Sequence, residues 1–533
     1  MKKNLLGISL ITISCLYVLL SAIIILVTIV VGYPPIYGIG ISIIVLLLQF
    51  LISPFITDLS MKWFYKAKFD HEMPEYLNNF IKEVCTNNNM KYPKIGYIDD
   101  GAPNAFTYGH TKNDARIVIT RGILELLDEE EVKSVVGHEL GHAVHYDMLV
   151  MTVAQLVPLV LYFVYEMFTS RDNDDNNSGK GAAIGYLAYI LYVISNYIVL
   201  WLSRTREYYA DSFSIEVTKN PNSLASALVK IGYGLTTANT NKKHSTAKSN
   251  ALGIFDSKTS KSLVVTSYDN GTISKDHIKN AMKWEQWNIW AIWYEFNSTH
   301  PLISKRLLAI SSRSKEYNQE PFITFDLEKP ESFVDDFLIE VLINSLPGFI
   351  FFIGLIVFII LLLIVPVAPK IQLLIIPITI ILMLLASYLK FVRRHPNKDY
   401  SDRTIRDLLG EVKVSNITAI PCTLQGEVIG RGDPGYIFNE DMTLKDQTGI
   451  IFLDYNQPLF IINKIYGLFK NNQNLGKQIK VTGWYRRSPV PYVEIKTYEV
   501  DGQVKTIFTY PLSKALYIIG FIINIVLIIL LMK

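Results

Sequence analysis

The chain has 533 residues, of which 50% are hydrophobic and only 19% are charged. This composition excludes an ordinary soluble protein and indicates an integral membrane protein with several domains. The 51 basic and 48 acidic residues leave a formal charge of +3, which gives no sign of a nucleic-acid surface, and three widely spaced cysteines predict neither a disulfide framework nor a zinc knuckle.

Seven apolar stretches are long enough to cross the roughly 30 Å hydrocarbon core of a bilayer as helices. Lysines and arginines fall on the same side of the membrane when these spans alternate, and the positive-inside rule makes that side cytoplasmic. We therefore predict a multi-pass protein of the cell membrane, with spans at Leu5–Val31, Ile36–Ile56, Met148–Phe168, Ala183–Leu202, Pro347–Ala368, Ile371–Leu389 and Ala515–Met532.

The first polar segment lies between the second and third spans. Its last predicted helix begins after Asp128, the expected N-cap, and Glu131 completes a capping box three residues on. The hydrophobic pattern before this helix predicts another helix and two short strands, at Met73–Asn88, near Ile95–Ile98 and near Arg116–Thr120.

The helix after Asp128 carries an H-E-x-x-H motif at His138, Glu139 and His142. Residues four apart stack on one helix face, so both imidazoles can bind the same metal ion. In the metalloprotease signature two such histidines bind zinc, and the glutamate is the general base. With 9 histidines in 533 residues, composition predicts at most on the order of 0.01 chance matches. The motif therefore predicts a single Zn²⁺ at His138 and His142, with Glu139 as the catalytic base.

Catalytic zinc usually has three protein ligands, so the two histidines require a partner. Two helical turns beyond them stands Met148, which excludes the longer motif with a third histidine at that position. His145 is close in sequence, but one helix cannot easily direct all three side chains at one ion. We interpret His145 as a polar residue at the membrane surface.

The third and fourth spans form a predicted antiparallel hairpin that returns the chain to the cytoplasmic side. His142 precedes the first helix, and Glu207 follows the second, by about 8 to 9 Å of helix each. Glu207 is therefore the predicted third ligand, and Asp211, one turn on, is the predicted hydrogen-bond acceptor for a ligand imidazole. The alternative is an ion-pair face formed with Arg204 and Arg206.

Two later segments have a recognisable character. The polar stretch Thr236–Asn250 predicts a mobile loop, and the aromatic segment Trp284–Phe296 is expected to pack on the catalytic core, with the bilayer interface as the alternative. After the sixth span, short β-rich runs and a helix predicted at Leu459–Lys470 indicate a small OB-like barrel. The predicted strands are Glu411–Ile420, Thr423–Gly430, Gly449–Tyr455, Lys477–Tyr485 and Tyr492–Val500.

Oligonucleotide binding is one use of an OB-like barrel, and Tyr485, Arg486 and Arg487 are the candidate patch for it. Because a fold does not determine a function, we favour a structural or protein-docking module and expect no nucleic-acid partner.

The motifs and their order resemble the membrane-embedded zinc metalloproteases that include the heat-shock protease HtpX and the CAAX prenyl proteases. The resemblance implies a gluzincin-type fold, with zinc on His138, His142 and Glu207. It also implies that substrate lies along an edge strand, and that His300 stabilises the oxyanion of the reaction. The implied edge strand is Asn104–Thr107, and the substrate-binding residues so implied are Asn104, Ala105 and Phe106. The matching segments are Pro103–Phe106, Arg116–Gly122, Leu127–Glu131, the H-E-x-x-H motif followed by Asp147–Met148, Ser203–Asp211, Asn220–Pro221 with Leu224–Ala225, and Ser298–Pro301 with Arg306.

We therefore expect a multi-pass α-helical membrane protein with a mainly helical metalloprotease domain, a small edge β-sheet and a C-terminal OB-like β-barrel. The resemblance does not extend to the last three spans or to the barrel. The expected domains are two N-terminal membrane helices (1–56), the first catalytic part (57–147), a membrane hairpin (148–202), the second catalytic part (203–344), a second hairpin (345–390), the barrel (391–510) and a C-terminal membrane helix (511–533).

The expected function is zinc-dependent cleavage of membrane proteins or their cytosolic segments, as in HtpX-like quality control, with the site at the cytoplasmic face. The partners are a polypeptide substrate and the lipid bilayer; the oligomeric state is not predicted. Two alternatives remain open. One is a CAAX-type protease that trims lipidated proteins, and the other is a non-enzymatic membrane scaffold whose β-module binds partners.

Overall fold

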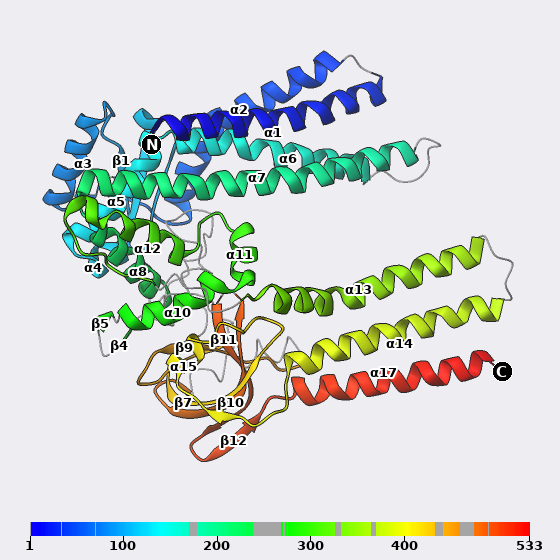
Figure 1. The fold of residues 1–533 in the computed structure, drawn as a ribbon. Helices are drawn as coiled ribbons and strands as arrows, with labels where there is room; N and C mark the ends of the chain where they lie inside the picture. Colours follow the sequence, from blue (N-terminus) through cyan, green and yellow to red (C-terminus); the bar gives the residue numbers. More distant parts are fainter. Residues whose placement is uncertain are drawn as a thin grey trace. The chain divides into compact units, whose positions relative to one another are not determined.

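The chain divides into two compact units, 1–261 with 293–325 and 262–292 with 326–533 (Figure 1). The computed structural model describes residues 2–32, 35–69, 71–169, 178–237, 268–269, 272–273, 275–325, 332–363, 369–431, 441–458, 474–488 and 490–532. The predicted loop beyond residue 237 and the predicted helix at Leu459–Lys470 lie outside these residues.

The first unit contains a three-stranded sheet in the order β1-β3-β2. The central strand β3 (Ala115–Thr120) is buried along its whole length, as its run of β-branched residues predicts. Strand β1 (Lys94–Ile98) runs parallel to β3 and strand β2 (Ala105–Gly109) antiparallel, so β2 is one edge of the sheet. The two strands predicted in this segment are confirmed.

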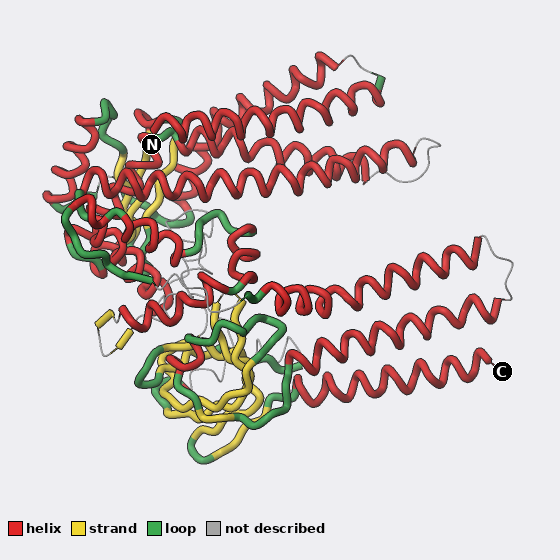
Figure 2. Tube along the Cα trace, in the orientation of Figure 1, coloured by secondary structure: helices red, strands yellow, loops and turns green. Residues whose placement is uncertain are grey.

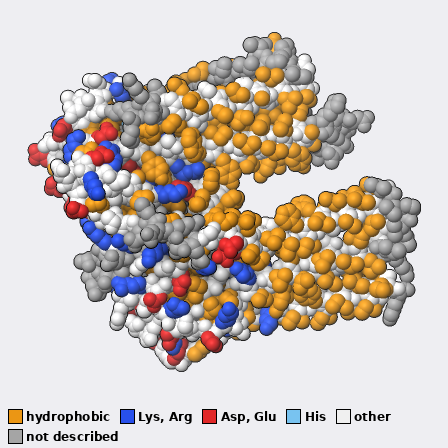
Figure 3. Space-filling model, in the orientation of Figure 1, with side chains coloured by type: hydrophobic (Ala, Val, Ile, Leu, Met, Phe, Trp, Pro, Cys, Tyr) orange, Lys and Arg blue, Asp and Glu red, His pale blue; other side chains and the backbone are white. Residues whose placement is uncertain are grey.

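Four long helices of the first unit are apolar along most of their length: α1 (Lys2–Val31), α2 (Pro35–Trp63), α6 (Asp147–Thr169) and α7 (Ser178–Thr218). Helices α1, α6 and α7 share one apolar core, in which Leu16 and Leu20 meet Val157, Leu161 and Ala188. Their outer surfaces are covered with hydrophobic side chains (Figure 3), as expected of helices that face lipid.

The remaining helices of the first unit are shorter and amphipathic: α3 (Glu75–Asn87), α4 (Arg121–Leu126), α5 (Glu129–Val144), α8 (Pro221–Thr237) and α12 (Ile303–Ser312). The predicted capping box of α5 is confirmed. Asp128 Oδ1 accepts from the Glu131 amide at 2.9 Å, and Glu131 Oε2 accepts from the Asp128 amide at 3.0 Å. Glu131 also accepts from Ser226 and Lys230 on α8, so the cap fixes α5 to a second helix.

A sharp break separates α5 from the membrane helix α6. Tyr146 has φ +60°, a left-handed conformation that is costly for a bulky residue, and α6 begins at the next residue. The break lets Asp147 turn back toward α5 rather than continue along its face.

The second unit contributes three more apolar helices, α13 (Val334–Leu363), α14 (Pro369–Arg394) and α17 (Thr509–Met532). Across the described residues of both units, six helices are long and apolar enough to cross a membrane, and they confirm six of the seven predicted spans. The other predicted span, Ile36–Ile56, lies in the helix α2 and stays a prediction.

The second unit also holds a closed five-stranded barrel (Figure 2). Its order is β7-β8-β9-β11-β10, with β10 pairing back on β7; β9 and β11 are parallel and the other pairs are antiparallel. The strands are β7 (Ile420–Arg431), β8 (Met442–Lys445), β9 (Ile450–Asp454), β10 (Gln478–Ser488) and β11 (Val490–Val500), with short β6 (Ser401–Asp402) and β12 (Gln503–Thr506) at the sides.

One predicted strand is wrong, and one of the five barrel strands was missed, as were the short β6 and β12. Within the predicted strand Glu411–Ile420, only Ile420 belongs to a strand. Ser415 Oγ accepts hydrogen bonds from the backbone amides of Ile417 and Thr418, which fold this segment into a tight turn. The missed barrel strand is β8, which pairs between β7 and β9.

The candidate nucleic-acid patch of the barrel is not exposed. Tyr485, Arg486 and Arg487 are fully buried, and the Arg487 guanidinium lies 4.8 Å from the ring centroid of Trp284. Trp284 is on α10 (Lys275–Trp287) and donates to the Val414 carbonyl at 2.7 Å. Tyr485, Arg486 and Arg487 therefore have a structural role inside the second unit. Trp284 packs in this unit too, rather than on the catalytic core.

Candidate metal centre

Helices α5 and α7 bring three predicted ligands together. His138 Nε2 and His142 Nε2 are 3.1 Å apart. Glu207 on α7 places one carboxylate oxygen 3.6 Å from His138 Nε2 and the other 3.5 Å from His142 Nε2. These three residues are the one group of potential metal ligands found among the described residues. The membrane hairpin of α6 and α7 therefore carries a carboxylate to both imidazoles.

The other nitrogen of each imidazole contacts a carboxylate. His138 Nδ1 lies 2.9 Å from Asp211 Oδ1, and His142 Nδ1 lies 2.6 Å from Asp147 Oδ2. A ring whose Nδ1–H donates to a carboxylate presents the lone pair of Nε2. Both lone pairs then point at the space shared with Glu207.

Two buried arginines hold the two carboxylates. Arg306 donates to both oxygens of Asp211, at 2.9 and 2.6 Å, and lies 3.4 Å from Glu207. Arg206 pairs with Asp147 and also donates to the His145 carbonyl at 2.7 Å. The predicted ion-pair alternative, in which Glu207 and Asp211 pair with Arg204 and Arg206, does not match these contacts.

The charges of the cluster favour a cation at its centre. Burial lowers the pKa of His138, but its hydrogen bonds to Asp211 and Glu207 outweigh burial and raise the pKa to about 9. Burial and the charge on His138 lower the pKa of His142 to about 4. The carboxylates around the two rings therefore favour a positive charge within the cluster.

The spacing of the three side chains also fits zinc. Nitrogen and oxygen ligands lie about 2.0–2.1 Å from a tetrahedral zinc, which separates neighbouring ligand atoms by roughly 3.3 Å. The separations of 3.1, 3.5 and 3.6 Å agree with that value.

Glu139 faces the sheet edge from α5. Its Oε2 accepts a 2.7 Å hydrogen bond from the hydroxyl of Thr107, which is on the edge strand β2. The three residues expected to bind substrate lie at the start of this strand. Ala105 and Phe106 are buried, and Asn104 is half-buried. The backbone amide of Asn104 donates to the Thr120 hydroxyl.

His300 reaches the same cluster from a loop before α12. Its Nδ1 lies 3.1 Å from Glu207 Oε2. The loop is fastened by Arg204, which donates to the carbonyls of Glu295, Phe296 and Ser298. His145 stays outside the cluster, with its ring against Tyr209 and Phe213.

Three residues have contacts at this site that were not predicted from the sequence: Asp147, Thr107 and Arg306. Asp147 had one signal, a carboxylate at the boundary of an apolar span, where charge is costly unless it has a partner. Thr107 lies in the implied edge strand and Arg306 in a segment that carries the family resemblance, but their contacts with Glu139 and Asp211 arise only through the folding of distant segments.

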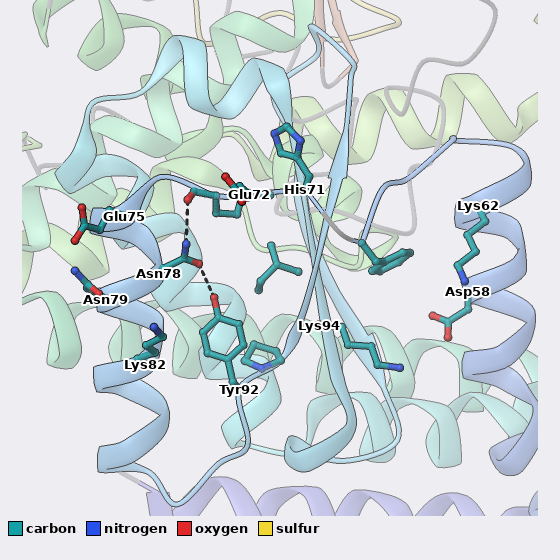
Figure 4. A pocket seen from close by; sticks show the side chains of 14 residues that line it. Asp58, Lys62, His71, Glu72, Glu75, Asn78, Asn79, Lys82, Tyr92 and Lys94 are labelled. Atoms are coloured by element: carbon teal, nitrogen blue, oxygen red, sulfur yellow. Dashed lines mark hydrogen bonds between the residues drawn. The ribbon is translucent and has the colours of Figure 1, made fainter.

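A cavity of about 880 Å³ in the same unit contains none of these residues (Figure 4). It lies between α2, α3 and β1, and its lining mixes lysines with acidic side chains. Asn78 in its wall accepts from the Tyr92 hydroxyl and donates to the Met73 carbonyl, so its amide is already used. We assign no ligand to this cavity.

Two histidines and a glutamate beside a membrane hairpin are typical of a membrane-bound metalloprotease. Residues 72–314 match the family model described as peptidase family M48. A protease HtpX homolog of Methanothermobacter thermautotrophicus is 44% identical over 188 residues, which are 35% of this chain and 69% of the homolog. An HtpX homolog of Thermoplasma acidophilum is 29% identical over 292 residues, which are 52% of this chain and 89% of that protein.

The chain therefore belongs to peptidase family M48, whose members are zinc metalloproteases, and the resemblance to HtpX is confirmed. It is a multi-pass membrane metalloprotease. The crystal structure of S. mikatae Ste24p also aligns, with 16% identity and a TM-score of 0.34 over 55% of this chain and 62% of that one.

Proposed function

We propose that this protein is a zinc-dependent endopeptidase that cleaves membrane proteins or their cytosolic segments at the cytoplasmic face of the membrane. The observation that carries the proposal is the pair of His138 and His142 Nε2 atoms turned toward Glu207, while both Nδ1 atoms contact carboxylates. In the proposed site His138, His142 and Glu207 hold the ion, and Asp211 and Asp147 orient the two rings.

The proposed chemistry is hydrolysis of a peptide bond. A bound zinc ion supplies Lewis acidity, which acidifies a water molecule and polarises the scissile carbonyl. Glu139 takes the proton from the attacking water and passes a proton to the leaving amine. His300, held by the loop that Arg204 fastens, is the proposed donor to the oxyanion.

We assign substrate binding to the free edge of β2. An extended peptide can pair with an exposed strand edge through main-chain hydrogen bonds, and β2 pairs on its other side with β3. A substrate paired with this edge would run along Asn104, Ala105 and Phe106. It would then lie next to Thr107, whose hydroxyl donates to Glu139.

The barrel is proposed to be of the OB type. Support comes from its five-stranded closure and from the parallel pairing of β9 with β11, which places the last barrel strand between the third and fourth. Because its two central arginines are buried, we propose a structural or protein-docking role for it.

Thr107 offers a test of how Glu139 is positioned. We expect Thr107→Val to lower kcat/KM by about tenfold, because a hydrogen bond to a charged group contributes about 1.5–3 kcal/mol. Zinc content should not change, since Thr107 contacts no proposed ligand. Thr107→Ser keeps the hydroxyl and should recover most of the activity. Equal rates for the Val and Ser variants would contradict this role.

The function is tested with purified full-length protein and a membrane-anchored substrate. We expect one zinc per chain, loss of cleavage with a chelator and recovery when zinc is returned. Glu207→Gln keeps the size of the side chain but should weaken zinc binding by at least about 100-fold. Chelator-resistant cleavage, or full zinc content in Glu207→Gln, would overturn the assignment.

A further inference from the structure

A second cavity, of about 400 Å³, lies in the membrane hairpin. Helix α6 lines it with Met151, Gln155, Pro158, Leu159 and Tyr162, and helix α7 lines it with Tyr192, Asn196, Val199, Leu200 and Ser203. Thr299, the neighbour of His300, lines it as well.

One end of the cavity lies about one helical turn from residues of the metal centre. On α7 the lining residues Tyr192, Asn196 and Ser203 lie on the helix face that continues, one turn further, to Glu207. On α6 the face that starts at Asp147 continues through Met151 to Gln155. Both walls therefore start one helical turn from a residue of the site, Glu207 on α7 and Asp147 on α6, and run away from it into the apolar hairpin.

Its dimensions suit a short piece of polypeptide. From Ser203 to Tyr192 the wall extends by about 16 Å of helix, roughly half of the hydrocarbon core. An extended chain needs about five residues to cover that length. At the far end the Tyr162 and Tyr192 rings are in contact, with centroids 5.5 Å apart.

The walls carry polar groups that a lipid chain does not need. Gln155 is exposed and Asn196 is half-buried, and among the described residues neither side-chain amide has a hydrogen-bond partner. Pro158 interrupts the wall of α6, because it has no N–H to donate to the Ala154 carbonyl as the helix pattern requires. Unpaired polar groups are costly at membrane depth and usually mark a functional site.

We propose that this cavity binds the cytosolic end of a substrate's transmembrane segment in an unwound conformation and leads it to the metal centre. Gln155 and Asn196 each offer a donor and an acceptor to the main chain that unwinding frees, while Leu159, Val199 and the two tyrosines contact its apolar side chains. This inference rests on the proposed peptidase function and names its substrate class and route.

The test compares two substrates that share one cleavage sequence, one anchored by a single transmembrane segment and one soluble. The readout is the ratio of kcat/KM for the anchored to the soluble substrate. We expect Gln155→Leu and Asn196→Leu each to lower this ratio about fivefold, which corresponds to the loss of one ordinary hydrogen bond. Thr152→Val is the matched control, since Thr152 is on α6 but outside the lining, and should leave the ratio unchanged.

A second measurement does not depend on rates. A photo-crosslinking residue at Leu159 in the inactive Glu139→Gln background should capture the anchored substrate, whereas one at Phe163, exposed on α6 outside the lining, should not. Unchanged ratios, or capture of phospholipid alone at Leu159, would overturn the inference while leaving the peptidase function intact. If wild-type protein cleaves neither substrate, the proposed function itself fails.

Discussion

Glu139→Gln is expected to reduce kcat by about 10³- to 10⁴-fold and to leave zinc bound. The magnitude follows from the loss of a general base that acts in the transition state. Zinc should remain because Glu139 is outside the His138, His142 and Glu207 group. The amide oxygen of the new side chain can still accept from the Thr107 hydroxyl, so the fold of the site should survive. Initial rates on the anchored substrate and elemental analysis of the purified variant measure the two effects.

The matched control for this substitution is Glu130→Gln. Glu130 is on the same helix, largely exposed, and pairs with Lys133 at 2.7 Å. Its loss should change neither rate nor zinc content, because exposed ion pairs contribute little. Near-normal cleavage by Glu139→Gln would refute the role of this glutamate, and loss of zinc in that variant would mean that Glu139 is a ligand.

The parts of the site that sequence could predict are those with a local pattern. The i, i+4 spacing of His138 and His142 is a property of one helix, and the capping box at Asp128 positions that helix. Glu207 is 65 residues beyond His142, yet the lengths of two apolar helices are enough to place it, because the bilayer sets how far each helix travels.

The parts that sequence could not predict depend on packing between distant segments. Thr107 reaches Glu139 because β2 lies beside α5, and which residue of an edge strand meets a helix is not visible in the strand alone. The buried Arg487 looked like a surface charge in sequence, although its guanidinium packs on the ring of Trp284, some 200 residues earlier in the chain. Glu411–Ile420 has the composition of a strand. The hydrogen bonds that Ser415 Oγ accepts from the following backbone amides nevertheless fold this segment into a turn.

Arg306 lies far from the H-E-x-x-H motif in the sequence, but it donates to Asp211, which contacts His138 of that motif. Its side chain is fully buried, and burial lowers its pKa, but the adjacent Asp211 outweighs burial and raises the pKa above the ordinary arginine value. The guanidinium therefore stays charged and balances two carboxylates, Asp211 and Glu207, that are themselves buried. Without it, the buried Asp211 would lose the cation that donates to both of its oxygens.

Arg306→Ala is expected to destabilise the protein by about 3–5 kcal/mol, the usual result of leaving a buried charge without its partner. Zinc affinity should fall by about 10- to 100-fold, because Asp211 no longer holds His138 in place. Thermal unfolding in detergent, with and without zinc, measures the first effect, and zinc titration measures the second. Arg306→Lys should give an intermediate result, since lysine keeps the charge but loses the two-pronged contact.

Two further variants separate charge balance from general disruption. Arg313→Ala removes a partly exposed arginine just after α12, paired with Glu316 at 3.1 Å, and should cost less than about 1 kcal/mol. Asp211→Asn combined with Arg306→Ala should be less destabilised than the sum of the single variants, because the unpaired carboxylate is removed with its partner. Additive losses in the double variant would show that Arg306 acts through packing, and that His138 owes its orientation to something other than this ion pair.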